Sequence, residues 1–145
     1  MSRILVATDG SGGASRAVDY AARRAKKAGA DLVIVNVIGG YELPDKVVRA
    51  FTRAESAWLR EELSSLSAEM LTKARDRARR IGVKAIRLES RTGEVAQTII
   101  AVARDLKADA VVVGKRGSGR VAGLLLGSVS QKLVSLAAIP VTVVP

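Results

Sequence analysis

The sequence predicts an α/β protein: a doubly wound, five-stranded parallel sheet of strand order 3-2-1-4-5, a Rossmann-like α/β/α sandwich. Short runs that are apolar on both faces, such as 32–38 and 110–113, are typical of strands buried between two layers. Segments with apolar residues at helical spacing follow these runs, and this alternation favours parallel strands joined by right-handed crossovers. Apolar residues on both faces also place the first strand, 4–7, at the centre of the sheet.

Glycine and proline separate the predicted elements. Gly29 and Gly82 follow helical patterns, where glycine commonly ends a helix, and Pro140 precedes the last apolar run. Serines at 64, 65 and 67 leave open whether the longest helical pattern is continuous. We expect strands over 4–7, 32–38, 83–90, 110–113 and 141–144, and helices over 14–28, 46–81, 95–106 and 128–137.

Length and composition exclude several classes of protein. With 145 residues, 48% of them hydrophobic, we expect one domain, 1–145, with a core of its own. The chain has no cysteine and no histidine, which excludes disulfide scaffolds, thiolate nucleophiles and histidine-based acid–base or metal chemistry. The net charge of +10 favours anionic partners. Without a signal peptide or the ~20 apolar residues that span a bilayer, we expect a cytoplasmic protein with no membrane partner.

Glycine-rich loops follow the first and fourth predicted strands. In the predicted order these strands are neighbours, and the crevice between them is where doubly wound sheets bind ligands. The second loop, 114–127, holds five glycines and ends in Gly127-Ser128 at a helix start, where backbone N–H groups suit phosphate. The alternative is a surface loop with solvated charges. Its basic side chains are Lys115, Arg116 and Arg120.

Other nucleotide-binding motifs fit less well. No segment matches the P-loop pattern GxxxxGK[S/T]. The stretch 117–122 fits GxGxxA, but no acidic residue follows Asp109 to bind a ribose, which disfavours nicotinamide and flavin dehydrogenases. Asp9, after the first strand, has two interpretations: a ligand to a ribose or to Mg²⁺ on phosphates, or a turn-forming and helix-capping residue.

The second loop has the spacing G-x2-G-x9-G-S, formed by Gly114, Gly117, Gly127 and Ser128. This spacing, the opening ILVATDGS, the run VIVNVI, the segment TGEVAQTII and the closing LGSVSQKLVSLAAIPVTVV resemble the ATP-binding branch of the universal stress protein family. The resemblance covers almost the whole chain and is weakest over 41–73.

The resemblance implies an ATP site, with Mg²⁺ or Mn²⁺ bound through the phosphates. It implies Asp9 on the ribose and the backbone of Val37 at the adenine edge. Two positions depart from the pattern: Val95 replaces a frequent proline, and Ser118 replaces a frequent Arg or Lys. The nucleotide-binding residues that it implies are Ala7, Thr8, Asp9, Val37, Val113, Gly114, Arg116, Gly117, Gly127, Ser128 and Val129.

The resemblance implies a universal stress protein that binds ATP at the crevice between the first and fourth strands and acts as a nucleotide-dependent stress-response module. The last strand, 141–144, is apolar and at the sheet edge, so we expect a homodimer through this strand, as the resemblance also implies. No residue is evident as a water-activating base, so we expect no dedicated enzyme and at most slow ATP hydrolysis.

The segment 73–91 carries eight basic and two acidic residues. One interpretation is a solvated helix face and edge strand. The alternative is a nucleotide-independent stress protein whose basic surface binds nucleic acid or an acidic partner. Since the segment has no aromatic residue for base stacking, we expect no nucleic-acid partner.

Overall fold

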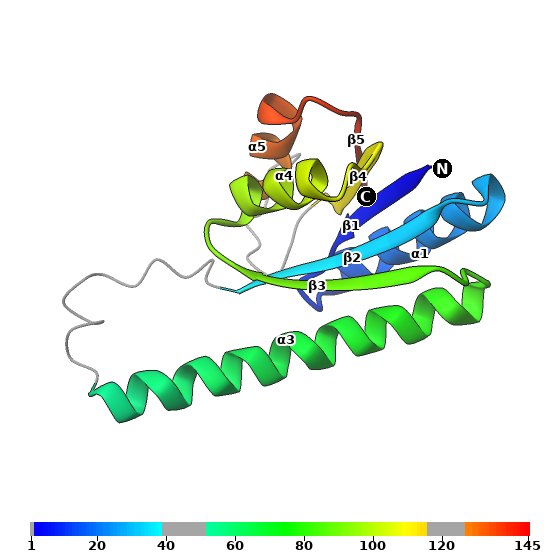
Figure 1. Cartoon of the computed structure of the whole chain (residues 1–145). Coiled ribbons are helices and arrows are strands. Elements are labelled where there is room, and N and C mark those ends of the chain that lie inside the picture. Colours follow the sequence, from blue (N-terminus) through cyan, green and yellow to red (C-terminus); the bar gives the residue numbers. More distant parts are fainter. Residues whose placement is uncertain (1, 39–51, 116–126) are drawn as a thin grey trace.

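The central strand of the sheet is β1 (Arg3–Ala7), as Figure 1 shows. The computed structural model describes residues 2–38, 52–115 and 127–145. Within these ranges five parallel strands follow the order β3-β2-β1-β4-β5, which confirms the predicted fold class and strand order. The other elements are α1 (Gly12–Ala28), β2 (Asp31–Ile38), α3 (Arg53–Ile81), β3 (Ile86–Thr92), α4 (Val95–Asp105), β4 (Ala110–Gly114), α5 (Ser128–Leu136) and β5 (Val141–Val144).

Two hydrophobic cores lie on opposite faces of the sheet. Because successive strand residues point to opposite faces, Val6 and Ile34 pack with α1 and α3, whereas Leu5 and Val33 pack with α4 and α5. All four side chains are at most 1% exposed. Each fully buried aliphatic side chain contributes about 1.5–3 kcal/mol, so this packing holds the carboxyl ends of β1 and β2 in place.

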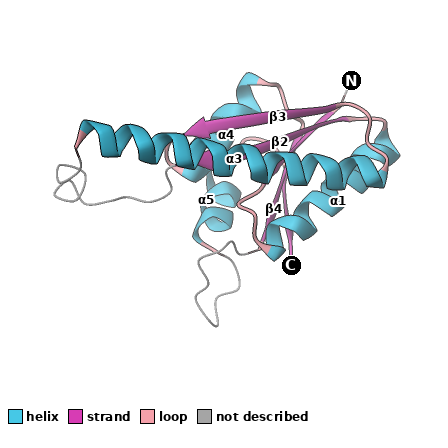
Figure 2. Ribbon diagram, turned by 90° about the horizontal axis from the view of Figure 1, so that it is seen from below, coloured by secondary structure: helices cyan, strands magenta, loops and turns pink. Residues whose placement is uncertain are grey.

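The helix α1 lies close to the sheet because most of its buried residues are alanines. It begins after Ser11, whose Oγ accepts a hydrogen bond from the Ala14 N–H at 3.1 Å, and it ends at Gly29 with a φ of 65°. Figure 2 shows α3 on the same side of the sheet as α1, and the two helices pack against each other. The predicted helix over 14–28 is therefore confirmed, with two more residues at its start.

The long helix α3 begins later than the predicted helix over 46–81. Thr52 is its N-cap and accepts a hydrogen bond from the Glu55 N–H at 3.0 Å, while 39–51 lie outside the described residues. The helix runs without interruption through the serines at 64, 65 and 67. Its buried residues all lie between Ser67 and Ala78, and its first half extends beyond the sheet (Figure 1).

The third strand is displaced from the prediction, 86–92 rather than 83–90. Gly82 has a φ of 117°, and the Val83 N–H donates to the Ala78 carbonyl at 3.2 Å, so this residue belongs to the helix C-cap. Val83 is buried, which explains why it resembles a strand residue in the sequence. The strand then extends along β2 to its end, where Ile38 pairs with Thr92.

Candidate functional site

The carboxyl end of β1 turns sharply into α1, and buried hydrogen bonds fix this turn. The Thr8 N–H donates to the Val35 carbonyl at 2.9 Å, and Asn36 Nδ2 donates to the Thr8 carbonyl at 2.7 Å. Thr8 Oγ1 accepts from the Gly10 N–H at 3.2 Å. Thr8 and Asn36 are both buried, so β2 holds the exit of β1 rigidly.

Asp9 shapes the loop that leads into α1. Its Oδ1 accepts a hydrogen bond from the Ser11 N–H at 2.9 Å, which is an Asx turn. Gly10 adopts a φ of 80°, a left-handed conformation that favours glycine. The turn-forming interpretation of Asp9 is confirmed, whereas the helix cap is Ser11.

Gly114 ends β4 directly against the first turn of α1. A Cβ atom at this position would lie 2.9 Å from the Gly13 carbonyl oxygen and 3.0 Å from its carbon. These backbone atoms cannot move independently of α1, so the approach requires glycine. The first glycine of the motif is therefore explained by packing, because it lets the end of β4 lie against the start of α1.

The two ends of the glycine-rich loop are joined by hydrogen bonds. The Gly127 N–H donates to the Lys115 carbonyl at 2.8 Å. Ser130 is buried and its Oγ donates to the Gly114 carbonyl at 2.8 Å and contacts the Lys115 carbonyl at 3.2 Å. The start of α5 is thereby fixed beside the carboxyl end of β4.

The first turn of α5 differs from those of α1, α3 and α4. Ser11, Thr52 and Glu94 each accept hydrogen bonds from the backbone of the helix that they cap. The N-cap of α5 is Gly127, which has no side chain to accept one. The backbone N–H groups at this end, with the positive end of the helix dipole, suit an anion.

Glu94 neutralises the neighbouring start of α4. Its carboxylate accepts hydrogen bonds from the Gln97 N–H at 2.9 Å and the Ala96 N–H at 3.3 Å, and Lys132 of α5 lies 3.4 Å away. The hydrogen bond from Gln97 is the main reason why the pKa of Glu94 lies below its ordinary value. The start of α4 is therefore capped by an acidic side chain, whereas the N-cap residue of α5, Gly127, supplies none.

Four of the predicted site residues contribute to one apolar cluster, on the face of the sheet covered by α4 and α5. They come from β1, β2, β4 and α5, so they bring together segments that are far apart in the sequence. These residues are Ala7, Val37, Val113 and Val129.

The remaining predicted residues are divided by position. Thr8, Asp9 and Gly114 lie at the carboxyl edge of β1 and β4, and Gly127 and Ser128 lie at the start of α5. Two others, Arg116 and Gly117, lie outside the described residues.

Asn36, Met70 and Ser130 support this edge, and the sequence reasoning missed all three. Met70 of α3 lies 3.4 Å from the position of a Cβ atom on Gly10, and its sulfur lies 3.6 Å from Asn36 Nδ2. A signal existed for Asn36, a single polar residue inside an apolar strand. No comparable signal marks Met70 or Ser130.

No group of three or more acidic residues within 2–38, 52–115 and 127–145 is arranged to hold a metal ion. In the same ranges, no helix is long and apolar enough to cross a membrane.

Comparisons with known proteins connect this geometry to one family. The model of the universal stress protein family matches residues 1–145. A universal stress protein of Thermus aquaticus is 34% identical over 150 residues, which cover 97% of this chain and 96% of that protein.

Two solved structures are also similar. A universal stress protein in complex with cAMP is 28% identical, with a TM-score of 0.72, over 99% of this chain and 96% of the other. UspA of Lactobacillus plantarum has the same fold, with 24% identity, a TM-score of 0.83 and coverage of 99% and 97%. Since the family model matches the whole chain, the protein belongs to the universal stress protein family.

Proposed function

We propose that this protein binds ATP at the carboxyl edge of β1 and β4 and acts in the cytoplasm as a nucleotide-dependent stress-response module. In this proposal the whole chain, 1–145, is one nucleotide-binding domain of the ATP-binding branch. The observation that carries the proposal is the start of α5: its N-cap residue, Gly127, has no side chain to cap it, and it is fixed beside Gly114 at the sheet edge. The cAMP complex of a 28% identical protein supports an adenine nucleotide.

Each part of ATP has a counterpart in the proposed site. The phosphates bind to the backbone of Gly127, Ser128 and Val129 at the start of α5, where N–H groups and the helix dipole attract them. The adenine and ribose bind over the apolar cluster and the turn after β1. The residues proposed for these contacts are Ala7, Thr8, Asp9, Val37, Val113 and Gly114, with Arg116 and Gly117 from the loop at the phosphates.

We propose Mg²⁺ or Mn²⁺ as an ion that the phosphates bring with them. The side chains that fit it best are the Asp9 carboxylate and the Ser128 hydroxyl, because both ions prefer oxygen ligands. We propose a binding site rather than a catalytic one, with ATP hydrolysis at most slow, because none of the residues proposed for it is evident as a water-activating base.

We also propose a homodimer that forms through β5. The opposite edge of the sheet, β3, is protected by charge: Glu89 pairs with Arg87 at 2.8 Å and with Arg91 at 3.1 Å. Charged side chains of this kind discourage strand pairing. β5 has the sequence VTVV, carries no charge and is half-buried throughout. A second copy of β5 would satisfy its outward backbone groups.

A thermal-melt series tests the nucleotide proposal. ATP, ADP, AMP, NAD and FMN are compared over a wide concentration range, with and without Mg²⁺. At ~100 times its dissociation constant, ATP should stabilise the fold by about 2.7 kcal/mol. A shift with FMN or NAD but with no adenine mononucleotide would contradict the choice of ligand, and no shift with any of the five would contradict nucleotide binding.

A further inference from the structure

A cluster of basic side chains lies between α1 and α3, at the ends of these helices away from the candidate nucleotide site. We call this cluster the basic seam. α1 starts beside the carboxyl edge of the sheet and runs back toward the amino edge, so its last turns and those of α3 come together there (Figure 2). The basic seam consists of Arg23, Lys26, Arg77, Arg80 and Lys84.

The contacts around Asp19 of α1 show that these side chains are close together. Arg77 of α3 donates two hydrogen bonds to this carboxylate, from Nε at 2.6 Å and from a terminal nitrogen at 2.9 Å. The hydrogen bond from Arg77 is the main cause that lowers the pKa of Asp19, and the charges of Arg23 and Arg80 lower it further. Arg77 is therefore bound to this carboxylate, and the guanidinium groups of Arg23 and Arg80 are near enough for their charges to act on it.

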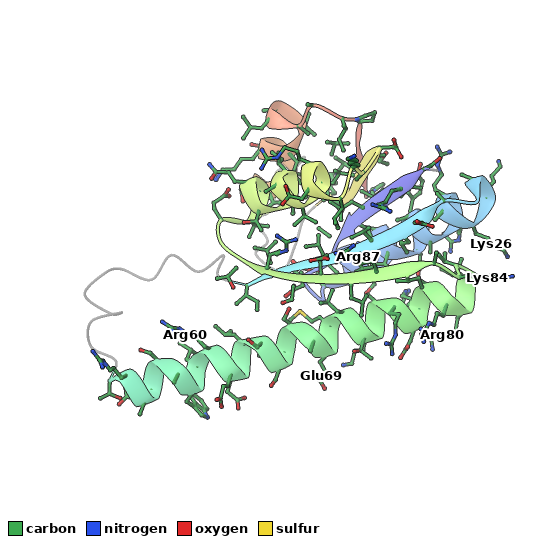
Figure 3. The ribbon with its side chains drawn as sticks, in the orientation of Figure 1. Lys26, Arg60, Glu69, Arg80, Lys84 and Arg87 are labelled. Carbon is green, nitrogen blue, oxygen red and sulfur yellow. The ribbon has the colours of Figure 1, made fainter. Side chains whose placement is uncertain are left out.

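Lys26 and Lys84 extend the basic seam to the end of α3. The side chain of Lys26 lies along Gly82, with its Nζ 3.2 Å from the position of a Cβ atom on that residue. Figure 3 places Lys26, Arg80 and Lys84 at the same end of the molecule. Further exposed basic residues flank them on the same two helices: Arg24, Lys27, Lys73 and Arg79.

The positive charge of the basic seam exceeds what the fold requires. In the described part of the chain, Asp19 is the acidic residue that pairs with the seam, through Arg77. The seam therefore keeps four positive charges in excess of one carboxylate. Two helix C-termini supply about half a negative charge each, which offsets about one of these four. The remaining charges lie on exposed side chains of Arg23, Lys26, Arg80 and Lys84.

We propose that the basic seam binds the phosphate backbone of a nucleic-acid duplex. Arginine side chains present planar donor groups that match phosphate oxygens, and a row of them attracts a polyanion at long range. Single strands are less suitable, because their recognition uses exposed aromatic platforms. The large exposed hydrophobic residues of the described chain lie away from the seam, which also disfavours membrane insertion. They are Trp58, Leu66, Val134 and Leu136.

The sequence alone did not favour this partner, because the segment 73–91 has no aromatic residue for base stacking and contains only part of the basic seam. Arg23 and Lys26 come from α1, about fifty residues earlier, and only the packing of α1 against α3 brings them to the same surface. The seam and the nucleotide site lie at opposite ends of the parallel strands. Duplex binding and ATP binding are therefore separable in experiments.

A matched pair of triple variants tests the proposal. Arg23→Gln/Arg80→Gln/Lys84→Gln removes three charges from the basic seam. Arg53→Gln/Arg60→Gln/Arg104→Gln removes three exposed charges from elsewhere, and so reaches the same net charge. Binding to a fluorescent 30-base-pair DNA duplex is measured by anisotropy at several salt concentrations. All variants are first compared by circular dichroism and by ATP binding, which should remain at the wild-type level.

The seam variant should bind the duplex at least about tenfold more weakly than the control variant at the same salt concentration. Its slope of log affinity against log salt should fall by about two to three, one for each lost phosphate contact. Equal binding by the two triple variants would overturn the proposal, because net charge alone would then explain the affinity. Stronger binding of a single strand or of anionic lipid vesicles than of the duplex would also overturn it.

Discussion

At the scale of single residues, the candidate site depends on positions where one atom more or less changes the geometry. Gly114 is the clearest case, because the atoms that a Cβ would approach belong to the backbone of Gly13. Ser130 is another, because its single hydroxyl group contacts the carbonyls of Gly114 and Lys115, where the glycine-rich loop begins. Neither residue carries a charged group to bind a ligand; both fix the backbone that would bind it.

Gly114→Ala should destabilise the protein by about 1–3 kcal/mol, because the added methyl group overpacks the contact between β4 and α1. Urea unfolding at equilibrium measures the change. Gly12→Ala is the control: its nearest neighbour is the flexible end of Arg16 at 3.6 Å, so we expect no loss of stability. Equal stability of both variants would contradict the role of the Gly114 contact.

Ser128 and Ser130 are two residues apart and should have different effects when changed to alanine. Ser130→Ala should lower the free energy of unfolding by about 1–3 kcal/mol, since the part-buried carbonyls of Gly114 and Lys115 lose their hydroxyl partner. Ser128 is exposed, so Ser128→Ala should leave stability within ~0.5 kcal/mol but weaken ATP binding. Chemical denaturation and ATP titration of both variants check this. If instead Ser130→Ala weakened ATP binding and Ser128→Ala lowered stability, Ser130 rather than Ser128 would contact the ligand.

At the scale of elements, α3 combines a packed second half with a first half that extends beyond the sheet. One ion pair connects the packed half to α1. Arg77 and Asp19 form it in bidentate geometry, and the side chains are 43% and 17% exposed. Exposed pairs contribute less than 1 kcal/mol in most proteins, so this pair should make a small but measurable contribution.

The contribution of Asp19 should depend on pH. Its pKa in the folded protein lies below the ordinary value of 3.8, mainly because Arg77 hydrogen-bonds to it. The stabilisation is therefore present above pH 3.8 and is lost as the pH falls through the folded-state pKa. The Asp19→Asn variant should have a lower free energy of unfolding than the wild type at pH 7. This difference should shrink below about pH 4, as the Asp19 carboxylate of the wild type becomes protonated.

Asp76→Asn serves as the control for this pH experiment. Asp76 is exposed and contacts Arg75, its neighbour in the same helix, at 3.3 Å. We expect the free energy of unfolding of the Asp76→Asn variant to equal that of the wild type at every pH. A difference for Asp19→Asn that stays constant down to pH 2.5 would show that the charge of this carboxylate does not stabilise the fold.

Helix and strand boundaries could be predicted from the sequence where local chemistry alone decides them. Gly29 and Gly82 mark the ends of α1 and α3 because both need positive φ. The start of α3 was missed, although Thr52 and Glu55 have the spacing of a capping box. The start of β3 could not be predicted, because burial of Val83 under a helix cap gives the same apolar signal as a strand.

The sequence predicts the positions of the glycines in the candidate site, but not the contacts that these and other residues make with distant segments. Spacing locates Gly114 and Gly127 in the loop, but the reason for Gly114 lies in α1, about a hundred residues away. The same limit applies to Ser130 and Met70, whose partners are set by the fold. Contacts between distant segments leave no periodic signal in a single sequence.

At the scale of the whole molecule, the two edges of the sheet differ, and this difference predicts the assembly. Backbone groups along a strand alternate in direction. The carbonyls of Pro140 and Val144 face β4, where they accept hydrogen bonds from Val111 and Lys115. The backbone groups of Val141 and Val143 therefore face away from the sheet.

Val143→Pro should weaken the proposed dimer and keep the hydrogen bonds between β4 and β5, since it removes an N–H on the outer side. Sedimentation equilibrium at micromolar concentration should give a dimer for the wild type and a monomer for the variant. Ser90→Pro on the opposite edge is the control and should remain dimeric, because the N–H of this exposed β3 residue also faces away from the sheet. A monomeric wild type, or a variant that stays dimeric, would contradict dimerisation through β5.

The central claim is that the start of α5 holds the phosphates of a nucleotide, and titration calorimetry with ATP tests it most directly. The wild type is compared with Gly127→Val, because the φ of −72° and ψ of 167° at this position also accommodate valine. We predict saturable binding of one ATP per chain to the wild type. We also predict affinity at least about tenfold weaker in the folded variant, because the side chain blocks the approach of phosphate to the backbone. No saturable binding to the wild type, or equal affinity in both proteins, would contradict the account.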